Sequence, residues 1–163
     1  MRLRTSRRMI KMKAKELFPD AQELRSGRIR IETTKDKVGM IIKKLKDNGY
    51  SHFVLLSCVD WIKDGKFELV YHMWSYEYRE HVMISTKINR DGESMLSLRA
   101  LFPQIETYER EIHEMFGVNF VGNPRLGEFI LEGWPHMPPM RKDFDTEKFV
   151  KDFYYKIPEV KEE

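Results

Sequence analysis

Cysteine is scarce in this sequence, because Cys58 is the one thiol among 163 residues. One cysteine cannot form an intramolecular disulfide. It also cannot hold an iron–sulfur cluster alone, since such clusters need about four thiolates. Cys58 stands in an apolar run, which is typical of a buried and unreactive thiol. The cysteine count therefore argues against a disulfide scaffold and against a cluster-binding chain.

Long apolar runs and common cofactor motifs are also missing. No run approaches the roughly 18 apolar residues that suggest a membrane-spanning helix, and no apolar signal-peptide core stands near the start. The Gly-x-Gly-x-x-Gly turn, the Walker-type loop, the Cys-x-x-Cys pair and the Gly-x-Ser-x-Gly elbow do not occur. We therefore expect neither nucleotide binding nor hydrolytic chemistry.

Charged residues are abundant, at 34% of the chain against about 25% in typical soluble proteins. Lys and Glu dominate, which favours a protein that works at high temperature. The net charge is +3, and the excess lies in residues 1–15, where the basic residues are Arg2, Arg4, Arg7, Arg8, Lys11, Lys13 and Lys15. We predict a basic N-terminal segment over residues 1–15 that is solvated, although such a segment can also bind RNA, anionic lipid or an acidic partner.

The hydrophobic periodicity predicts an α+β fold. Residues 28–32 alternate as a strand does, and the apolar residues at positions 38, 41, 42 and 45 form one helix face that ends at Asn48-Gly49. Residues 53–59, 67–75 and 81–89 read as three consecutive strands, with a hairpin turn at Asp64-Gly65. We expect a mainly antiparallel or mixed sheet with helices packed on one face, in a domain over residues 16–117.

The later part of the chain predicts two helices and then an arm. Residues 94–102 are expected to hold a short helix, and a second helix is expected to begin near Pro103 and to end at Gly117. Residues 117–145 are rich in Gly, Pro and aromatic residues, a composition that suits neither a helix nor a central strand. We therefore predict an extended Gly/Pro-rich C-terminal arm over residues 118–163, with a short terminal helix over residues 146–155.

The residues by themselves leave two functional alternatives open. Glu109, His113 and His136 could form the carboxylate–His site of a free-standing enzyme, although metal sites commonly need four ligands and a simple Glu–His contact on one helix face is preferred. The second alternative is a basic-tailed module that binds RNA or a membrane through residues 1–15. Nucleic-acid binding by the rest of the chain would need a basic stripe with aromatic residues. Outside residues 1–15 the sequence offers only a small aromatic turn at residues 76–80 that Glu77 and Glu80 interrupt, so no nucleic-acid partner is predicted.

Three ordered motifs carry a resemblance to a known family. They are the run Glu109-Arg110-Glu111-Ile112-His113-Glu114-Met115-Phe116-Gly117-Val118-Asn119-Phe120, the run Gly122-Asn123-Pro124-Arg125-Leu126, and the run from Gly133-Trp134-Pro135 to Arg141-Lys142-Asp143-Phe144. Together they resemble the 30-kDa (C-type) subunit family of complex I, NADH dehydrogenase. Asn123, Gly127-Glu128 and Tyr108 depart from the respiratory pattern, and they suit the short homologues in membrane-bound, energy-converting [NiFe] hydrogenases and related ferredoxin-linked complexes.

The resemblance implies a non-catalytic, cofactor-free subunit on the peripheral arm of a membrane-bound redox complex. Its neighbours would be a hydrogenase-like large subunit of the 49-kDa type, iron–sulfur subunits and, indirectly, membrane subunits, which would hold it on the cytoplasmic side of the membrane. The [NiFe] centre and the iron–sulfur clusters would lie in those partners. A ferredoxin-dependent hydrogenase is the preferred complex, and a respiratory NADH or ferredoxin:quinone complex or a sulfur-reducing complex is the alternative.

The same motifs supply the residues expected at the partner interface. Large aromatic side chains suit interface anchors, prolines limit the entropy lost on docking, and arginine forms bidentate contacts with carboxylates. The predicted interface residues are Glu109, Arg110, Glu111, Phe116, Gly117, Phe120, Asn123, Pro124, Trp134, Arg141, Lys142, Asp143 and Phe144.

Overall fold

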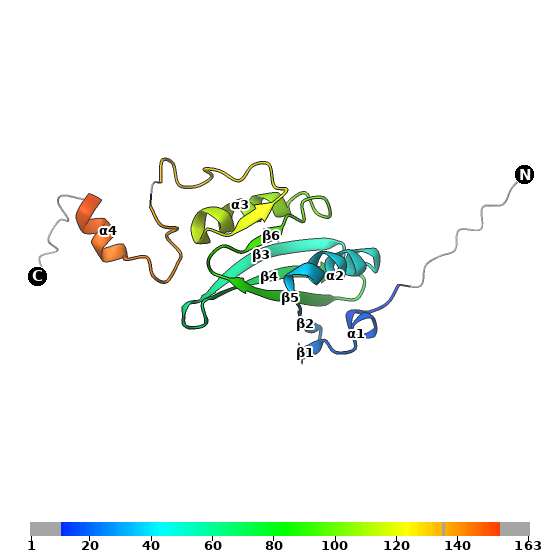
Figure 1. Ribbon diagram of the computed structural model, residues 1–163. Coiled ribbons are helices and arrows are strands. Elements are labelled where there is room, and N and C mark those ends of the chain that lie inside the picture. The colour runs from blue at the N-terminus through cyan, green and yellow to red at the C-terminus, as the bar shows by residue number, and fades with distance from the viewer. Residues whose placement is uncertain (1–10, 135, 154–163) are drawn as a thin grey trace, which may run out of the picture.

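A computed structural model describes residues 11–134 and 136–153 (Figure 1). Most of the predicted basic segment, together with Pro135 and the end of the predicted terminal helix, lies outside the described residues. The elements are α1 (Ala14–Leu17), β1 (Gln22–Arg25), β2 (Arg28–Glu32), α2 (Lys35–Asp47), β3 (His52–Trp61), a 3₁₀ turn (Ile62–Asp64), β4 (Lys66–Ser75), β5 (Glu80–Asn89), β6 (Ser94–Leu96), α3 (Ile105–Phe116), β7 (Asn119–Val121) and α4 (Thr146–Phe153).

The main sheet has five strands in the order β1-β2-β5-β4-β3, and it is mixed. Strands β3, β4 and β5 form the predicted antiparallel meander. The early strand β2 returns beside β5 and runs parallel to it, with Ile29 opposite Val82 and Ile31 opposite Ile84. The α+β fold with a mixed sheet is therefore confirmed, whereas the edge strand β1 was not predicted.

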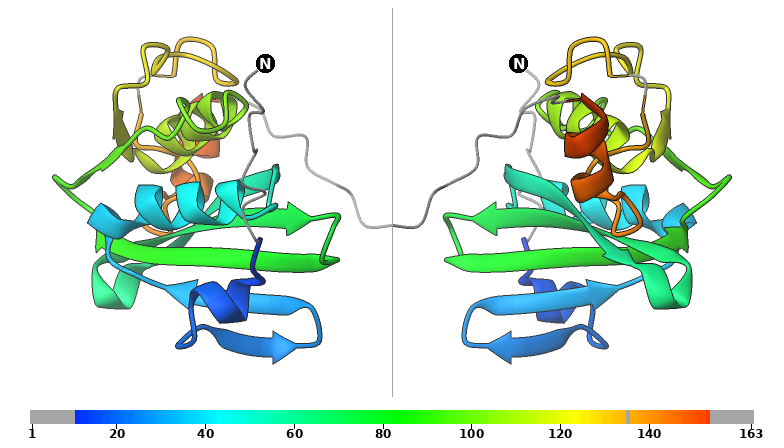
Figure 2. Two further views of the ribbon diagram at one scale, coloured as in Figure 1. Left: turned by 90° about the vertical axis from the view of Figure 1, so that its right-hand side faces the viewer. Right: turned by 90° about the vertical axis from the view of Figure 1, so that its left-hand side faces the viewer.

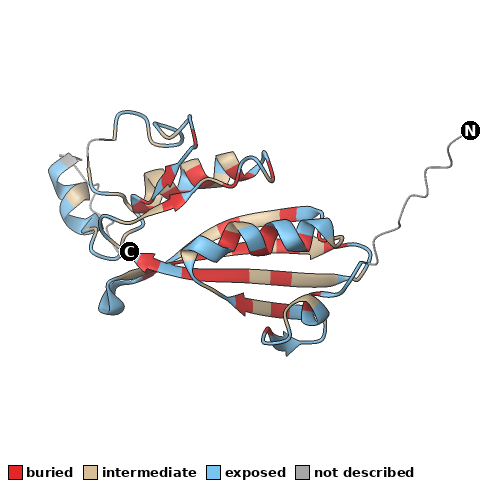
Figure 3. Cartoon of the chain, turned by 45° about the vertical axis from the view of Figure 1, so that its right-hand side comes forward, coloured by how far each residue is buried: buried red, intermediate tan, exposed pale blue. Residues whose placement is uncertain are grey.

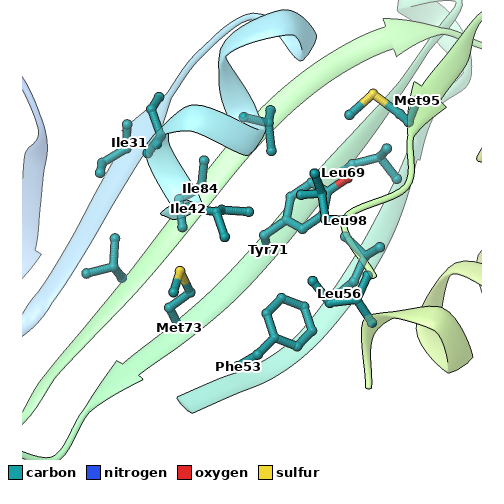
Figure 4. Close-up of a cluster of buried hydrophobic side chains, with 14 of the residues drawn as sticks. Ile31, Ile42, Phe53, Leu56, Leu69, Tyr71, Met73, Ile84, Met95 and Leu98 are labelled. Carbon is teal, nitrogen blue, oxygen red and sulfur yellow. The ribbon is translucent and has the colours of Figure 1, made fainter. Parts of the chain in front are cut away.

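The hydrophobic core lies on one face of this sheet, under α2 and α3 (Figure 2). The face of α2 that the apolar periodicity predicted is buried, and the helix ends at Asn48 as expected. Figure 4 shows Ile42 of α2 above Tyr71, Met73 and Ile84 of the central strands, all of them fully buried. No helix in the part of the chain that the structure describes is long and apolar enough to cross a membrane.

The helix predicted over residues 94–102 is wrong. Residues 94–96 form strand β6 instead, which pairs in parallel with β7 so that Met95 lies opposite Phe120. Both of these side chains are buried, and their contribution to the core offsets the weak local preference for a helix. The pairing partner is distant in sequence, so local periodicity could not reveal it.

The segment after β7 has turns and irregular backbone up to α4 (Figure 3). Most of its described residues are exposed, in contrast to the alternating burial of the sheet strands. Its main-chain contacts nevertheless include a hydrogen bond from Met140 N to Met115 O of α3, at 3.0 Å. Whether the segment acts as an extended arm stays a prediction.

Gly117 ends α3 in the left-handed conformation, with φ of 83°, as the sequence predicted. A Cβ atom at this position would lie only 3.2 Å from Cγ of Pro138. The glycine thus permits both the sharp exit from the helix and the close approach of the C-terminal segment.

We expect Gly117→Ala to lower the free energy of unfolding by more than the roughly 1–2 kcal/mol that a left-handed alanine costs, because Pro138 must also move. Gly65→Ala is the matched control, since Gly65 has φ of 63° and no atom within 4 Å of its added Cβ. Urea unfolding measures both losses, and equal losses would contradict the packing role of Gly117.

Candidate partner interface

A network of ion pairs holds the Arg141-Lys142-Asp143 motif against the main sheet. Arg90, which directly follows β5, contacts Asp60 of β3 through Nε, at 2.9 Å, and Asp143 through a second nitrogen, at 2.6 Å. Arg141 pairs with Asp91 at 2.9 Å, and Lys142 N donates a hydrogen bond to Asp60 at 2.9 Å. We call Asp60, Arg90, Arg141, Lys142 N and Asp143 the carboxylate clamp.

Both arginines of the clamp lie over the same aromatic ring. The guanidinium carbons of Arg90 and Arg141 each lie 5.5 Å from the centre of the buried Phe67 ring. The hydrogen bond from Arg90 lowers the pKa of the Asp143 carboxyl below its usual range, although partial burial acts in the opposite direction. The clamp therefore favours ionised Asp143 and joins two strands to a segment more than fifty residues later in the sequence.

Glu109 is the centre of a second, buried network. It is fully buried, and its carboxylate accepts hydrogen bonds from Leu98 N at 2.9 Å, from Ser97 Oγ at 2.7 Å and from Asn123 Nδ2 at 2.9 Å. Burial raises the pKa of Glu109, because the loss of hydration outweighs these three donors. The first Glu of the Glu-Arg-Glu motif therefore ties α3 to the strand regions on either side of it.

Two further charged residues of α3, Glu114 and Arg110, anchor the C-terminal segment. Glu114 accepts hydrogen bonds from three consecutive backbone N–H groups, those of Phe129, Ile130 and Leu131, at 2.8–3.1 Å. Burial opposes ionisation of Glu114, but these donors hold its pKa below the usual value. Arg110 donates to Glu128 O at 3.0 Å, and its guanidinium carbon lies 4.3 Å from the centre of the Phe129 ring.

Aromatic side chains join the segment to α4. The Trp134 ring centre lies 5.8 Å from that of Phe144 and 4.8 Å from that of Phe149 on α4. His136 also contacts this cluster, with its ring centre 5.3 Å from that of Trp134. Trp134 and Phe144, both predicted at the interface, are therefore packed within the chain on at least one side.

The predicted interface residues fall into three groups by burial. Glu109, Phe116, Phe120 and Asn123 are buried within the chain, so that their contacts are internal. Arg110, Trp134, Arg141 and Phe144 are half-buried. The exposed ones are Glu111, Gly117, Pro124, Lys142 and Asp143, of which Asp143 is already paired with Arg90. A partner role for any of them stays a prediction.

The alternative carboxylate–His site is not assembled by the fold. His113 and His136 line one hollow of about 320 Å³, but Glu109 is not among the described residues around it. His113 Nδ1 lies 2.9 Å from Val118 O, and Glu109 is bonded to its own three donors. Within residues 11–134 and 136–153, no group of three or more His, Cys, Asp or Glu residues is placed to hold a metal ion.

Sequence reasoning missed the clamp residue Arg90 and also Asp91, the ion-pair partner of Arg141. It also missed Phe67 and the role of Glu114. Local patterns carry no signal for a turn arginine that contacts residues 30 and 53 positions away.

We expect Arg90→Ala to lower the free energy of unfolding by about 3 kcal/mol, because it leaves the buried Asp60 carboxylate without its cation. Arg141→Ala is the matched comparison, and its loss should stay below about 1 kcal/mol per ion pair, since Asp91 is exposed. Chemical denaturation gives both values. A loss for Arg141→Ala equal to that for Arg90→Ala would contradict the central place of Arg90.

Glu109 should give the fold a measurable pH dependence. Its folded pKa lies above the unfolded value of about 4.3, so its contribution to stability is complete at acid pH and is lost as the pH rises through the folded pKa. The unfolding free energy of the wild type, relative to that of the non-titrating variant Glu109→Gln, should therefore fall as the pH rises from about 4. Urea unfolding of both proteins across this range tests the sign, and a wild type that gains stability relative to the variant as the pH rises would refute it.

Comparisons with known proteins agree with the motifs. Residues 31–150 match the family described as "Respiratory-chain NADH dehydrogenase, 30 Kd subunit". The C-type subunit of the NADH-quinone oxidoreductase of Rhizobium rhizogenes is 30% identical over 138 residues, which are 82% of this chain and 68% of that protein. The C-type subunit of the F(420)H(2) dehydrogenase of Methanosarcina mazei is 30% identical over 124 residues, which are 72% of this chain and 76% of that protein.

Solved structures extend the agreement to three dimensions. A chain of the membrane-bound sulfane sulfur reductase, an archaeal respiratory membrane complex, matches with a TM-score of 0.82 and 31% identity over 91% of both chains. A trypsin-resistant fragment of Nqo5 shares the fold, with a TM-score of 0.53 and 15% identity over 60% of this chain and 82% of the fragment. This chain therefore belongs to the family of the 30-kDa subunit of respiratory-chain NADH dehydrogenase.

Proposed function

We propose that this chain is a non-catalytic, cofactor-free accessory subunit on the peripheral arm of a membrane-bound redox complex. It would brace a hydrogenase-like large subunit of the 49-kDa type, while any [NiFe] centre and the iron–sulfur clusters lie in partner subunits. The supporting observation is the similarity to a chain of an archaeal respiratory membrane complex over 91% of both chains. Contacts with the partners would hold the subunit at the cytoplasmic side of the membrane.

The identity of the complex has two candidates. The sulfane sulfur reductase match favours a sulfur-reducing complex. The departures from the respiratory motifs at Tyr108, Asn123 and Gly127-Glu128 favour a ferredoxin-dependent hydrogenase as the second candidate. In either complex, the high Lys and Glu content supports work at high temperature.

The C-terminal segment is the proposed docking arm. Glu114, Arg110 and the carboxylate clamp fix its backbone on the domain, so little entropy remains to be lost when a partner binds. The same anchors leave large apolar side chains exposed at Ile130, Met137 and Met140. Exposed apolar groups on a pre-ordered backbone suit the central contacts of a protein interface.

Within the Arg-Lys-Asp motif, the two outer residues and the middle one have different surroundings. Arg141 and Asp143 take part in ion pairs of the clamp. Lys142 donates its backbone N–H to Asp60 of the clamp, and the residue is otherwise exposed to solvent. We therefore assign the partner contact of this motif to the Lys142 side chain and the anchoring to its neighbours.

The test is purification of the tagged chain in mild detergent, with mass spectrometry and metal analysis of what accompanies it. We expect a large subunit of the hydrogenase-like type with iron–sulfur and membrane subunits. Nickel together with hydrogen evolution would select the hydrogenase, whereas iron–sulfur proteins without nickel and with reduction of sulfane sulfur would select the sulfur-reducing complex. A monomer without partners would contradict the accessory role.

Lys142→Glu provides the matched variant for the docking arm. It should reduce recovery of the partner subunits without changing the melting temperature of the isolated chain, because the side chain is exposed. Arg90→Ala should reduce both, since it disrupts the clamp itself. Full recovery of partners by Lys142→Glu would remove this residue from the interface.

A further inference from the structure

A second concave surface lies between α2 and the β6–β7 pair. It encloses about 580 Å³, and none of the described residues that line it comes from the segment after Val121. The lining is mainly apolar, with polar groups from Lys35, Asp36 and Ser94. Its apolar residues are Val38, Gly39, Met40, Met95, Leu96, Leu98 and Val121, and we call the whole the α2 groove.

The floor of the α2 groove depends on a glycine inside a helix. A Cβ atom at Gly39 would lie 3.2 Å from Cδ2 of Leu98, so the helix approaches the neighbouring segment closely at this point. Figure 4 shows Met95 and Leu98 on that segment, and both are buried. A glycine in a helix interior is unfavourable by about 1 kcal/mol relative to alanine. The close approach brings α2 against Leu98 at the floor of the groove.

The rim of the groove exposes large apolar side chains. Met40 is 64% exposed, Leu96 68% and Val121 54%. Leu96 and Val121 lie opposite each other in the register of the parallel β6–β7 pair, so the backbone holds them side by side. Soluble proteins rarely leave such clustered apolar groups uncovered, and clusters of this kind commonly mark a protein interface.

The charge of α2 indicates what kind of surface would cover the groove. The helix carries five lysines, at positions 35, 37, 43, 44 and 46, against Asp36 and Asp47. Two of these lysines are already neutralised within the chain, because Lys35 pairs with Glu93 at 2.7 Å and Lys43 with Asp47 at 2.5 Å. Lys44 and Lys46 donate to the backbone oxygens of Leu17 and Leu101, which leaves their charges without a carboxylate in these contacts. An acidic partner would therefore meet complementary charge along the helix.

We propose that the α2 groove docks an acidic amphipathic helix of a neighbouring protein subunit. The apolar side of that helix would fill the groove between Met40, Leu96 and Val121, and its carboxylates would face the lysines of α2. A concave groove suits a helix better than the flat surface of a lipid bilayer. This inference rests on the proposed function, because it requires an assembly, but it assigns a surface separate from the C-terminal arm.

Photo-crosslinking in the intact complex tests the occupant. A benzophenone amino acid replaces Leu96 in the tagged chain, and the matched control places it at Tyr76, which directly follows β4 and is 70% exposed. We expect illumination to link position 96, but not position 76, to an acidic amphipathic segment of another subunit. Links from position 96 to lipid, to a second copy of this chain, to a basic segment, or to nothing in an otherwise complete complex would each overturn the inference.

The failure of this inference can be distinguished from failure of the proposed function. If the chain purifies with its complex but position 96 forms no link to a subunit, the groove assignment fails and the accessory role stands. If the chain carries no partners at all, both fail.

A charge introduced on the rim provides a second, independent measurement. Leu96→Asp should lower the yield of complete complex about tenfold, a change equal to 1.4 kcal/mol of binding, whereas Tyr76→Asp should leave the yield unchanged. Both residues are exposed, so the melting temperatures of the isolated variants should match that of the wild type. An unchanged yield with Leu96→Asp would overturn the proposal.

Discussion

Asp60 is buried at the end of β3, with 2% of its side chain exposed, and a carboxylate in that position is stable only when a cation and N–H donors surround it. Arg90 supplies the cation, and the backbone N–H of Lys142 supplies a donor. Because these two groups come from the end of β5 and from the C-terminal segment, the need to compensate one buried charge connects the sheet to the last third of the chain.

Two further carboxylates of α3 extend the same principle. Glu109 joins the helix to the segments that carry β6 and β7, and Glu114 holds three N–H groups of the following loop. An irregular segment rich in Gly and Pro has few main-chain bonds of its own, so side-chain acceptors must satisfy its donors. In this chain, Glu109, Asn123 and Glu114 of the recognised motifs thus act as internal anchors.

The sequence predicted the elements whose signals are local and failed where the decisive contact is distant. The four apolar positions of α2 and the Asp64-Gly65 turn have short-range periods, and both appear as expected. Residues 94–96 became a strand because they pair with residues 119–121, and no local pattern shows that pairing. Arg90 likewise resembles any turn residue in the sequence, although its contacts with Asp60 and Asp143 determine where the C-terminal segment lies.

Residue-resolved amide hydrogen exchange in the unmodified protein tests the internal anchoring most directly. The informative amides are those of residues 129–131, which donate to Glu114, and those of Met140 and Lys142, which donate to Met115 O and Asp60. If the segment is held as described, these amides exchange more slowly than those of an unstructured peptide. Exchange at the unstructured rate for all five would show that the carboxylates do not anchor the segment.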